Sequence, residues 1–155
     1  MKRILSLILT LAMVCLLMAS CSVLETLGFA KSGTNENVGG DENLRLWANA
    51  TYTSDTELGT GAKTIEVEVK VEDKSVTFTI HTDKEILGDA LLEHGLVAGE
   101  NGMYGLYVKT VNGMLADYDI NCSYWSFYKG GEMMMTGIDG ESISGGEHYE
   151  IIYAK

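Results

Sequence analysis

Proline is absent from the 155 residues, and cysteine occurs only three times, whereas glycine occurs 18 times. The turns must therefore rest on glycine, asparagine and aspartate, which tolerate positive φ angles. Basic residues are also few, because 11 Lys and Arg stand against 22 Asp and Glu, a formal net charge of −11. This charge argues against nucleic acid or an anionic membrane surface as a partner, since both would repel an acidic chain.

The first twenty residues have the pattern of a secretory signal. Lys2 and Arg3 precede an apolar run over residues 4–17, and two small residues stand directly before Cys21. A basic start, an apolar middle and a small-residue cleavage site describe a signal peptide, and the cysteine at the cut resembles a bacterial lipobox. The apolar run is shorter than the roughly 20 residues that span a bilayer. We therefore expect cleavage before Cys21, lipidation of its thiol, and an extracytoplasmic protein anchored by lipid to the cell membrane.

Cleavage would leave Cys122 as the only other cysteine, since Cys15 lies within the signal. No intramolecular disulfide could then form. A lone thiol outside the cell can be reactive, but a half-buried, small apolar residue is the simpler interpretation.

The composition divides the chain into three parts. Residues 1–20 are the predicted signal peptide, and residues 21–43 lack hydrophobic periodicity and are rich in Gly, Asn and Thr, as in a flexible tether. Residues 44–155 are the predicted folded domain. The 135 residues after the signal (155 − 20) suffice for one hydrophobic core.

Alternating apolar residues predict the first strands. Residues 44–52 alternate and are interpreted as a strand, whereas residues 53–63 are rich in Gly and Thr and are interpreted as a loop. The clearest strands are 65–71 and 76–80, joined by a tight connection at Asp73-Lys74. Only one side of each is apolar, so this hairpin should bury one face.

A helix is predicted after the hairpin. Thr82 and Glu85 stand in capping-box relation, the apolar residues of 86–91 fall on one helical face, and Gly95 suits the position after a helix end. Further strands are expected within 102–113, at 124–128, at 132–136 and at 149–154. This order predicts an α+β fold, a β-grasp-like mixed sheet with one packed amphipathic helix.

No catalytic or metal-binding pattern is complete. None of the three histidines sits in a metal-ligand motif. Residues 117–121 resemble the start of a calcium loop, but Cys122 and Tyr128 stand where such a loop needs Gly and Glu, so an Asx-rich turn is preferred. No nucleophile–base pattern or phosphate-binding loop is present. We therefore expect neither an enzyme nor a metal site.

Aromatic and methionine side chains are concentrated in the C-terminal half. They offer flat, adaptable contact area, which suits a large flat ligand or a protein partner. Some must belong to the core because sheets bury one face, but three consecutive methionines at 133–135 cannot all face inward. The candidate ligand-binding residues, expected to line an apolar shelf, are Tyr104, Tyr124, Trp125, Met133 and Met134.

Several short segments, taken in order, resemble the transcobalamin C-terminal-like domain of bacterial surface proteins. They are Gly105-Leu106-Tyr107-Val108 with Val111-Asn112-Gly113, Tyr124-Trp125-Ser126-Phe127-Tyr128, Thr136-Gly137-Ile138-Asp139, and Ile143 with Gly146. The resemblance covers residues 44–155. It implies a β-grasp-like fold and a cobalamin-like (corrinoid) ligand, since the related domain of the animal carriers closes over one face of the corrin ring.

The sequence thus favours a lipid-anchored binding protein that captures a corrinoid or another flat ligand for an uptake transporter. The alternative is a surface interaction or adhesion module that binds a protein or a glycan. The alternative predicts a flat aromatic patch without a pocket.

Overall fold

The computed structural model describes residues 38–155, and it describes side chains from residue 43 onward. The predicted signal peptide, Cys21 and most of the predicted tether lie outside the described residues. The helices within the described part include none with the length and apolar character needed to cross a membrane.

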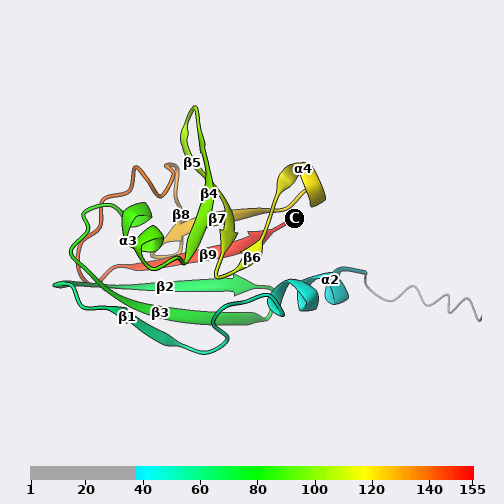
Figure 1. Ribbon diagram of the computed structural model, residues 1–155, viewed down its shortest axis with the longest axis horizontal. Helices are drawn as coiled ribbons and strands as arrows, with labels where there is room; N and C mark the ends of the chain where they lie inside the picture. Colours follow the sequence, from blue (N-terminus) through cyan, green and yellow to red (C-terminus); the bar gives the residue numbers. More distant parts are fainter. Residues whose placement is uncertain (1–37) are drawn as a thin grey trace, which may run out of the picture. The chain divides into compact units, whose positions relative to one another are not determined.

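Six strands form a mixed sheet in the order β1-β3-β2-β9-β7-β8 (Figure 1). Their bounds are Thr56–Gly59 (β1), Lys63–Val71 (β2), Lys74–Thr82 (β3), Tyr124–Lys129 (β7), Glu132–Met133 (β8) and His148–Ala154 (β9). β2 and β3 form the predicted antiparallel hairpin, while β9 lies parallel to β2 and β1 parallel to β3. The two parallel pairs make the sheet mixed, as expected.

One face of this sheet forms the core because the alternation in β2 and β3 is strict. Ile65, Val67 and Val69 are buried, whereas Glu66 faces the other way and is exposed. The buried face is covered by helix α3 (Leu87–Glu93) and by a second sheet of three strands (Figure 1). The strands of the second sheet are Val97–Gly102 (β4), Gly105–Val111 (β5) and Met114–Leu115 (β6).

Helix α3 is the packed amphipathic helix that the sequence predicted. Leu87, Ala90 and Leu91 are buried against the sheet, and Gly95 follows the helix end with a φ of 63°. The α+β fold, with a mixed sheet and one packed amphipathic helix, is therefore confirmed. The predicted capping box is wrong: the N-cap is Ile86, without a side-chain cap, and the Thr82 hydroxyl oxygen instead accepts a hydrogen bond from the Lys84 amide at 3.1 Å.

The prediction of a strand at residues 44–52 is wrong. Helix α2 runs from Val38 to Trp47 and includes the last residues of the predicted tether. Leu46 and Trp47 pack against the core from this helix. A short apolar segment fits period two and period 3.6 about equally, and tertiary packing decided between them.

Three further strands were missed: β1, β4 and the two-residue β6. β1 lies inside the predicted loop 53–63, where an edge strand of four residues carries no apolar alternation to reveal it. β4 is exposed along five of its six residues and contains a bulge between Ala98 and Gly99, so it too lacks the pattern of a half-buried strand. The strand expected at 132–136 ends at Met133, and the turn of the first hairpin is Glu72-Asp73, one residue earlier than predicted.

Candidate functional site

The structure divides the five predicted shelf residues between two faces. Neighbouring residues on a strand point to opposite sides, so Tyr124 and Trp125 of β7 lie on opposite faces of the large sheet. Met133 of β8 pairs directly with Tyr128, which shares its face with Tyr124. Tyr124 and Met133 therefore belong to the face away from the core, and the five residues do not form one continuous shelf.

Trp125 lies on the core side and is 5% exposed. Its indole N–H donates to the Lys109 carbonyl oxygen at 3.3 Å, and its ring meets Tyr153 edge to face with centroids 5.6 Å apart. Met134 also packs against the core, and its amide donates to the Phe127 carbonyl oxygen at 2.9 Å. Trp125 therefore belongs to the core and Met134 packs against it, so neither forms part of an exposed shelf.

Tyr104 stands at the tip of the β4–β5 hairpin, which rises away from the large sheet (Figure 1). Tyr104 is 95% exposed and its neighbour Met103 is 89% exposed. The tip is held from one side by Asp139, whose carboxylate accepts a hydrogen bond from the Leu106 amide at 3.0 Å. The Asp139 carboxylate packs so closely on Gly105 that a Cβ there would lie 2.0 Å from its oxygen, and Gly105 has a φ of 105°. The hairpin tip therefore projects from the molecule while contacts with Asp139 fix its position.

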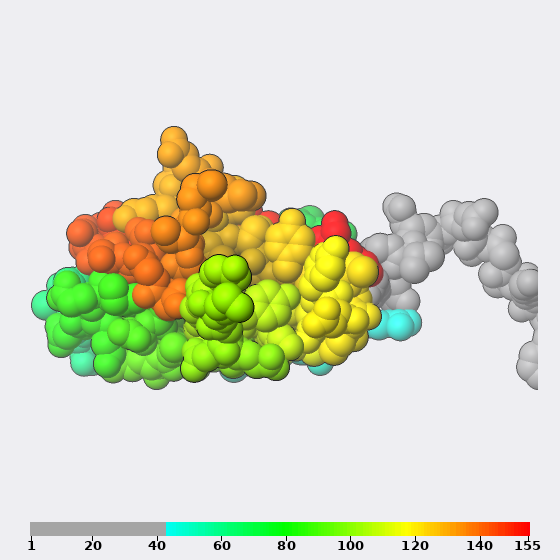
Figure 2. All heavy atoms as spheres, turned by 90° about the horizontal axis from the view of Figure 1, so that it is seen from above, coloured from blue at the N-terminus to red at the C-terminus, as the bar shows by residue number. Residues whose placement is uncertain are grey.

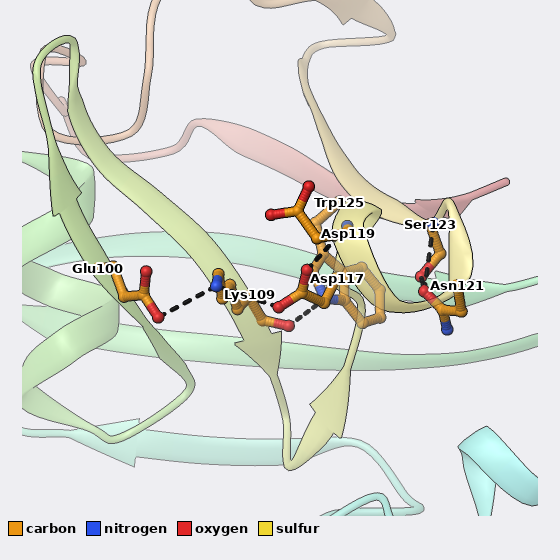
Figure 3. A network of polar contacts seen from close by, with 7 residues as sticks. All are labelled: Glu100, Lys109, Asp117, Asp119, Asn121, Ser123 and Trp125. Atoms are coloured by element: carbon orange, nitrogen blue, oxygen red, sulfur yellow. Dashed lines mark hydrogen bonds and ion pairs between the residues drawn. The ribbon is translucent and has the colours of Figure 1, made fainter.

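Helix α4 (Tyr118–Asn121) is braced against the same hairpin. Lys109 of β5 places its ammonium 3.0 Å from a carboxylate oxygen of Glu100 and 3.0 Å from one of Asp117 (Figure 3). Asp117 is the N-cap of α4, where it accepts from the Asp119 amide at 3.0 Å. The Lys109 ammonium lowers the pKa of Asp117, and Glu100 and then Asp117 raise the pKa of Lys109.

The same contacts show whether residues 117–121 form a calcium loop or an Asx turn. Asp117 makes the predicted Asx turn, and its second oxygen is occupied by Lys109. Among the described side chains, those of residues 43–155, no three from His, Cys, Asp or Glu lie together in a way that could hold a metal ion. Cys122 takes the left-handed position at the end of α4 with a φ of 58° and is exposed, so its expected half-buried position is wrong.

Further exposed apolar side chains lie on the same hairpin and on α4. We define the upper surface as Met103, Tyr104, Tyr107, Tyr118 and Ile120. Figure 2 shows the hairpin in yellow-green and α4 in yellow on one face of the molecule, with the segment around β8 in orange. The concentration of Tyr and Met in this part of the sequence indicated a possible binding surface, but no local pattern distinguished the exposed side chains from the buried ones.

No protein-family model matches the chain, and no curated protein matches it. Among solved structures, the chain is similar to a candidate metal-binding protein from Ruminococcus gnavus ATCC 29149, with 36% identity and a TM-score of 0.57. That similarity covers 60% of this chain and 97% of the other. The chain also resembles haptocorrin in complex with Cbi at 17% identity and a TM-score of 0.46, over 63% of this chain and 26% of haptocorrin. The first likeness shows a shared fold.

Proposed function

We propose that this chain is a lipid-anchored, extracytoplasmic binding protein that captures a flat ligand of the corrinoid class and catalyses no reaction. One observation carries the proposal. Five of the 11 large hydrophobic side chains exposed in the described residues lie on the β4–β5 hairpin and on α4, which the ion pair between Lys109 and Asp117 holds beside it. Exposed apolar side chains concentrated in this way mark binding surfaces.

The upper surface supplies the contact area. Tyr104 and Met103 project from the hairpin tip, and Tyr118 and Ile120 project from α4, which the ion pair between Lys109 and Asp117 fixes beside the hairpin. Aromatic rings and methionines can lie against a flat macrocycle, because they offer area and polarisable atoms at small entropic cost. The buried Trp125 stiffens the strand beneath and is not itself a contact.

The similarity to a candidate metal-binding protein is compatible with such a ligand. A corrinoid surrounds its metal ion with the nitrogens of its own ring, so a protein can hold it by surface contact without three protein ligands. The proposal also includes anchoring through a lipid on Cys21 and delivery of the ligand to an uptake transporter. Labelling cells with a radioactive fatty acid tests the anchor, because Cys21→Ser should remove the label from the protein.

The test is calorimetric titration of the full chain in detergent with cobalamin and with cobinamide. We expect a Kd in the micromolar range or below, about −8 kcal/mol. Tyr104→Ser should abolish the heat while leaving the fold unchanged, because the side chain is almost fully exposed. The matched control is Tyr124→Ser, since Tyr124 lies on the other face of the sheet and should bind normally. Absence of heat with both corrinoids would overturn the corrinoid proposal.

A second function, a surface module that binds a protein or a glycan, is favoured by one feature. Met103 and Tyr104 project from the surface, and a projection suits insertion into a groove on a partner. If no corrinoid binds, and Tyr104→Ser abolishes attachment of the chain to a host-cell or glycan surface, this second function replaces the first.

A further inference from the structure

The chain contains two Asn-Gly dipeptides that are followed by the same residue. Asn101-Gly102 lies at the end of β4, and Asn112-Gly113 lies between β5 and β6, each directly before a methionine. Asparagine before glycine is chemically labile, because glycine has no Cβ to hinder the approach of its backbone nitrogen to the asparagine side chain. Since the following residues are identical, a large difference in reactivity between the two dipeptides must come from the fold.

The fold protects Asn112. Its side chain is 1% exposed, and both its oxygen and its nitrogen are hydrogen-bonded to the backbone of Tyr52. Gly113 is enclosed as well, since a Cβ on it would lie 2.7 Å from the Asn49 carbonyl oxygen. A reaction between Asn112 and Gly113 would therefore have to break both hydrogen bonds and admit water to a buried turn.

Asn101 has neither form of protection. Asn101 and Gly102 are both exposed, and the Asn101 side chain forms no hydrogen bond with another of the described residues. The surroundings of Gly102 are open, because the nearest atom that a Cβ there would meet is the Gly105 carbonyl oxygen at 3.4 Å. Water and the Gly102 nitrogen can thus both reach the side chain of Asn101.

The end of β4 is also weakly paired. β4 is an edge strand of the three-stranded sheet, and a bulge between Ala98 and Gly99 interrupts its pairing with β5. Leu106 lies opposite Asn101 and donates its amide hydrogen bond to the Asp139 carboxylate, which fixes the β5 side of the hairpin tip. Strand ends with few buried contacts open locally at a small cost in free energy. Such opening lets the backbone at Asn101 adopt the geometry that a reaction with Gly102 needs.

We propose that Asn101 is a site of spontaneous modification, at which asparagine converts to isoaspartate and aspartate. The Gly102 nitrogen gives its proton to solvent and attacks Cγ of Asn101. A new bond forms between that nitrogen and Cγ, the bond from Cγ to the side-chain nitrogen breaks, and the released nitrogen takes up a proton and leaves as ammonia. Water then opens the cyclic imide at either of its two carbonyl carbons, adding hydroxyl to the carbon and a proton to the nitrogen. The reaction consumes one water and releases one ammonia, without oxidant, reductant or enzyme.

The conversion alters the upper surface, because the site lies directly before the hairpin tip (Figure 1). Isoaspartate adds one carbon atom to the main chain and brings a negative charge. The pairing of Gly102 with Gly105 depends on the present chain length, so Met103 and Tyr104 must move when the chain becomes longer. Weaker ligand binding through Tyr104 follows. This consequence rests on the proposed binding function, whereas the modification itself does not.

The test follows both dipeptides by mass spectrometry while the full chain is held in detergent at mildly alkaline pH. Trypsin cuts after Lys84, Lys109 and Lys129, so the two dipeptides fall on separate peptides. The peptide with Asn101 should gain the mass difference between amide and acid about tenfold faster than the peptide with Asn112, since only Asn112 must first lose two hydrogen bonds. It should also separate into two forms of equal mass, isoaspartate and aspartate. In urea, which unfolds the chain, the two rates should become similar.

Asn101→Gln is the matched control, because glutamine keeps the amide but must close a larger ring, so it should stay unmodified over the same period. Gly102→Ala should slow the conversion of Asn101, since its methyl group hinders the nitrogen while the surroundings have room for it. No conversion at Asn101 in the folded chain, or a rate no faster than that of Asn112, overturns the proposal.

Corrinoid titration before and after conversion is a separate measurement. Lower affinity of the converted protein supports the predicted movement of Tyr104, and unchanged affinity after full conversion overturns it. Absence of heat before conversion would contradict only the proposed corrinoid function, because the mass measurement uses no ligand.

Discussion

The side-chain amide of Asn112 forms a closed pair of hydrogen bonds with the backbone of Tyr52. The Tyr52 amide donates to Asn112 Oδ1 at 2.9 Å, and Asn112 Nδ2 donates to the Tyr52 carbonyl oxygen at 2.8 Å. The backbone of Asn112 adds bonds to Thr51 and Leu96. One buried turn residue thus joins the segment after α2, the start of β4 and the turn between β5 and β6.

Asn112→Ala should destabilise the protein by about 3 kcal/mol. The substitution leaves both polar groups of Tyr52 without their partner, and it places alanine at a φ of 49°, which asparagine tolerates better. Urea unfolding followed by circular dichroism measures the difference. The control is Asn101→Ala on the exposed strand β4, which should change stability by less than about 0.5 kcal/mol. Similar losses in both variants would contradict the role assigned to Asn112.

The same turn shows what the sequence could predict. An Asn-Gly dipeptide favours a turn with positive φ angles, and Asn112 and Gly113 adopt φ angles of 49° and 81°. The hairpin of β2 and β3 was recognised because its alternation lies within one stretch of chain. The partner of Asn112 was not predictable, since Tyr52 lies 60 residues away and belonged to a segment whose apparent alternation predicted a strand.

The candidate site was predictable only in its composition. The concentration of Tyr and Met was visible, but Tyr124 and Trp125 are neighbours with opposite burial, and only the sheet register separates them. The exposure of Asn101 and the burial of Asn112 had no sequence signal either, since both Asn-Gly dipeptides precede a methionine.

Acid should weaken the brace between α4 and β5. Hydrogen bonding to Lys109 holds the pKa of Asp117 below its ordinary value of 3.8. A carboxyl group whose pKa is lower in the folded state stabilises the fold above the unfolded pKa, and this stabilisation is lost as the pH falls through the folded value. Unfolding free energy should therefore decline below about pH 4.

Asp117→Asn should reduce that decline while keeping the acceptor that caps α4. Urea midpoints measured at pH 7 and pH 3 give the comparison, and Asp73→Asn in the exposed turn of the first hairpin serves as the control. An identical drop in midpoint for Asp117→Asn and the unmodified protein would show that Asp117 does not contribute to acid sensitivity.

High pH should destabilise the protein through ionisation of the Tyr149 hydroxyl. Its hydroxyl donates to a carboxylate oxygen of Glu147 at 2.7 Å, and the Lys129 ammonium lies 5.4 Å from the centre of its ring. Burial, reinforced by Glu147, raises the pKa of Tyr149 above its ordinary value of 10.0. The stabilisation is complete below the unfolded pKa and is lost as the pH rises above it.

Tyr149→Phe should lower the unfolding free energy at pH 7 by about 1 kcal/mol, the value of one hydrogen bond. Its stability should then fall less steeply above pH 10 than that of the unmodified protein. Denaturant unfolding at several alkaline pH values checks this, with Tyr118→Phe on the exposed face of α4 as the control. Parallel pH profiles for the unmodified protein and Tyr149→Phe would count against the assignment.

Asp139 should control the hairpin tip that carries Tyr104. Its carboxylate is the acceptor for the Leu106 amide, and its backbone lies close to Gly88 of α3, where a Cβ would be 3.2 Å away. Asp139→Ala removes the acceptor but leaves an exposed amide that water can satisfy. Global stability should therefore change by less than about 1 kcal/mol.

The local effect of Asp139→Ala should be larger than the global one. The amides of Met103 and Tyr104 should gain motion on the picosecond to nanosecond timescale, seen as lower heteronuclear NOE values. Asp73→Ala, in another exposed turn, should leave these values unchanged. Because a ligand would then have to order the tip on binding, corrinoid affinity should fall severalfold with the contact residues intact. A tip that stays rigid in Asp139→Ala would mean that the β4–β5 pairing alone holds Tyr104 in place.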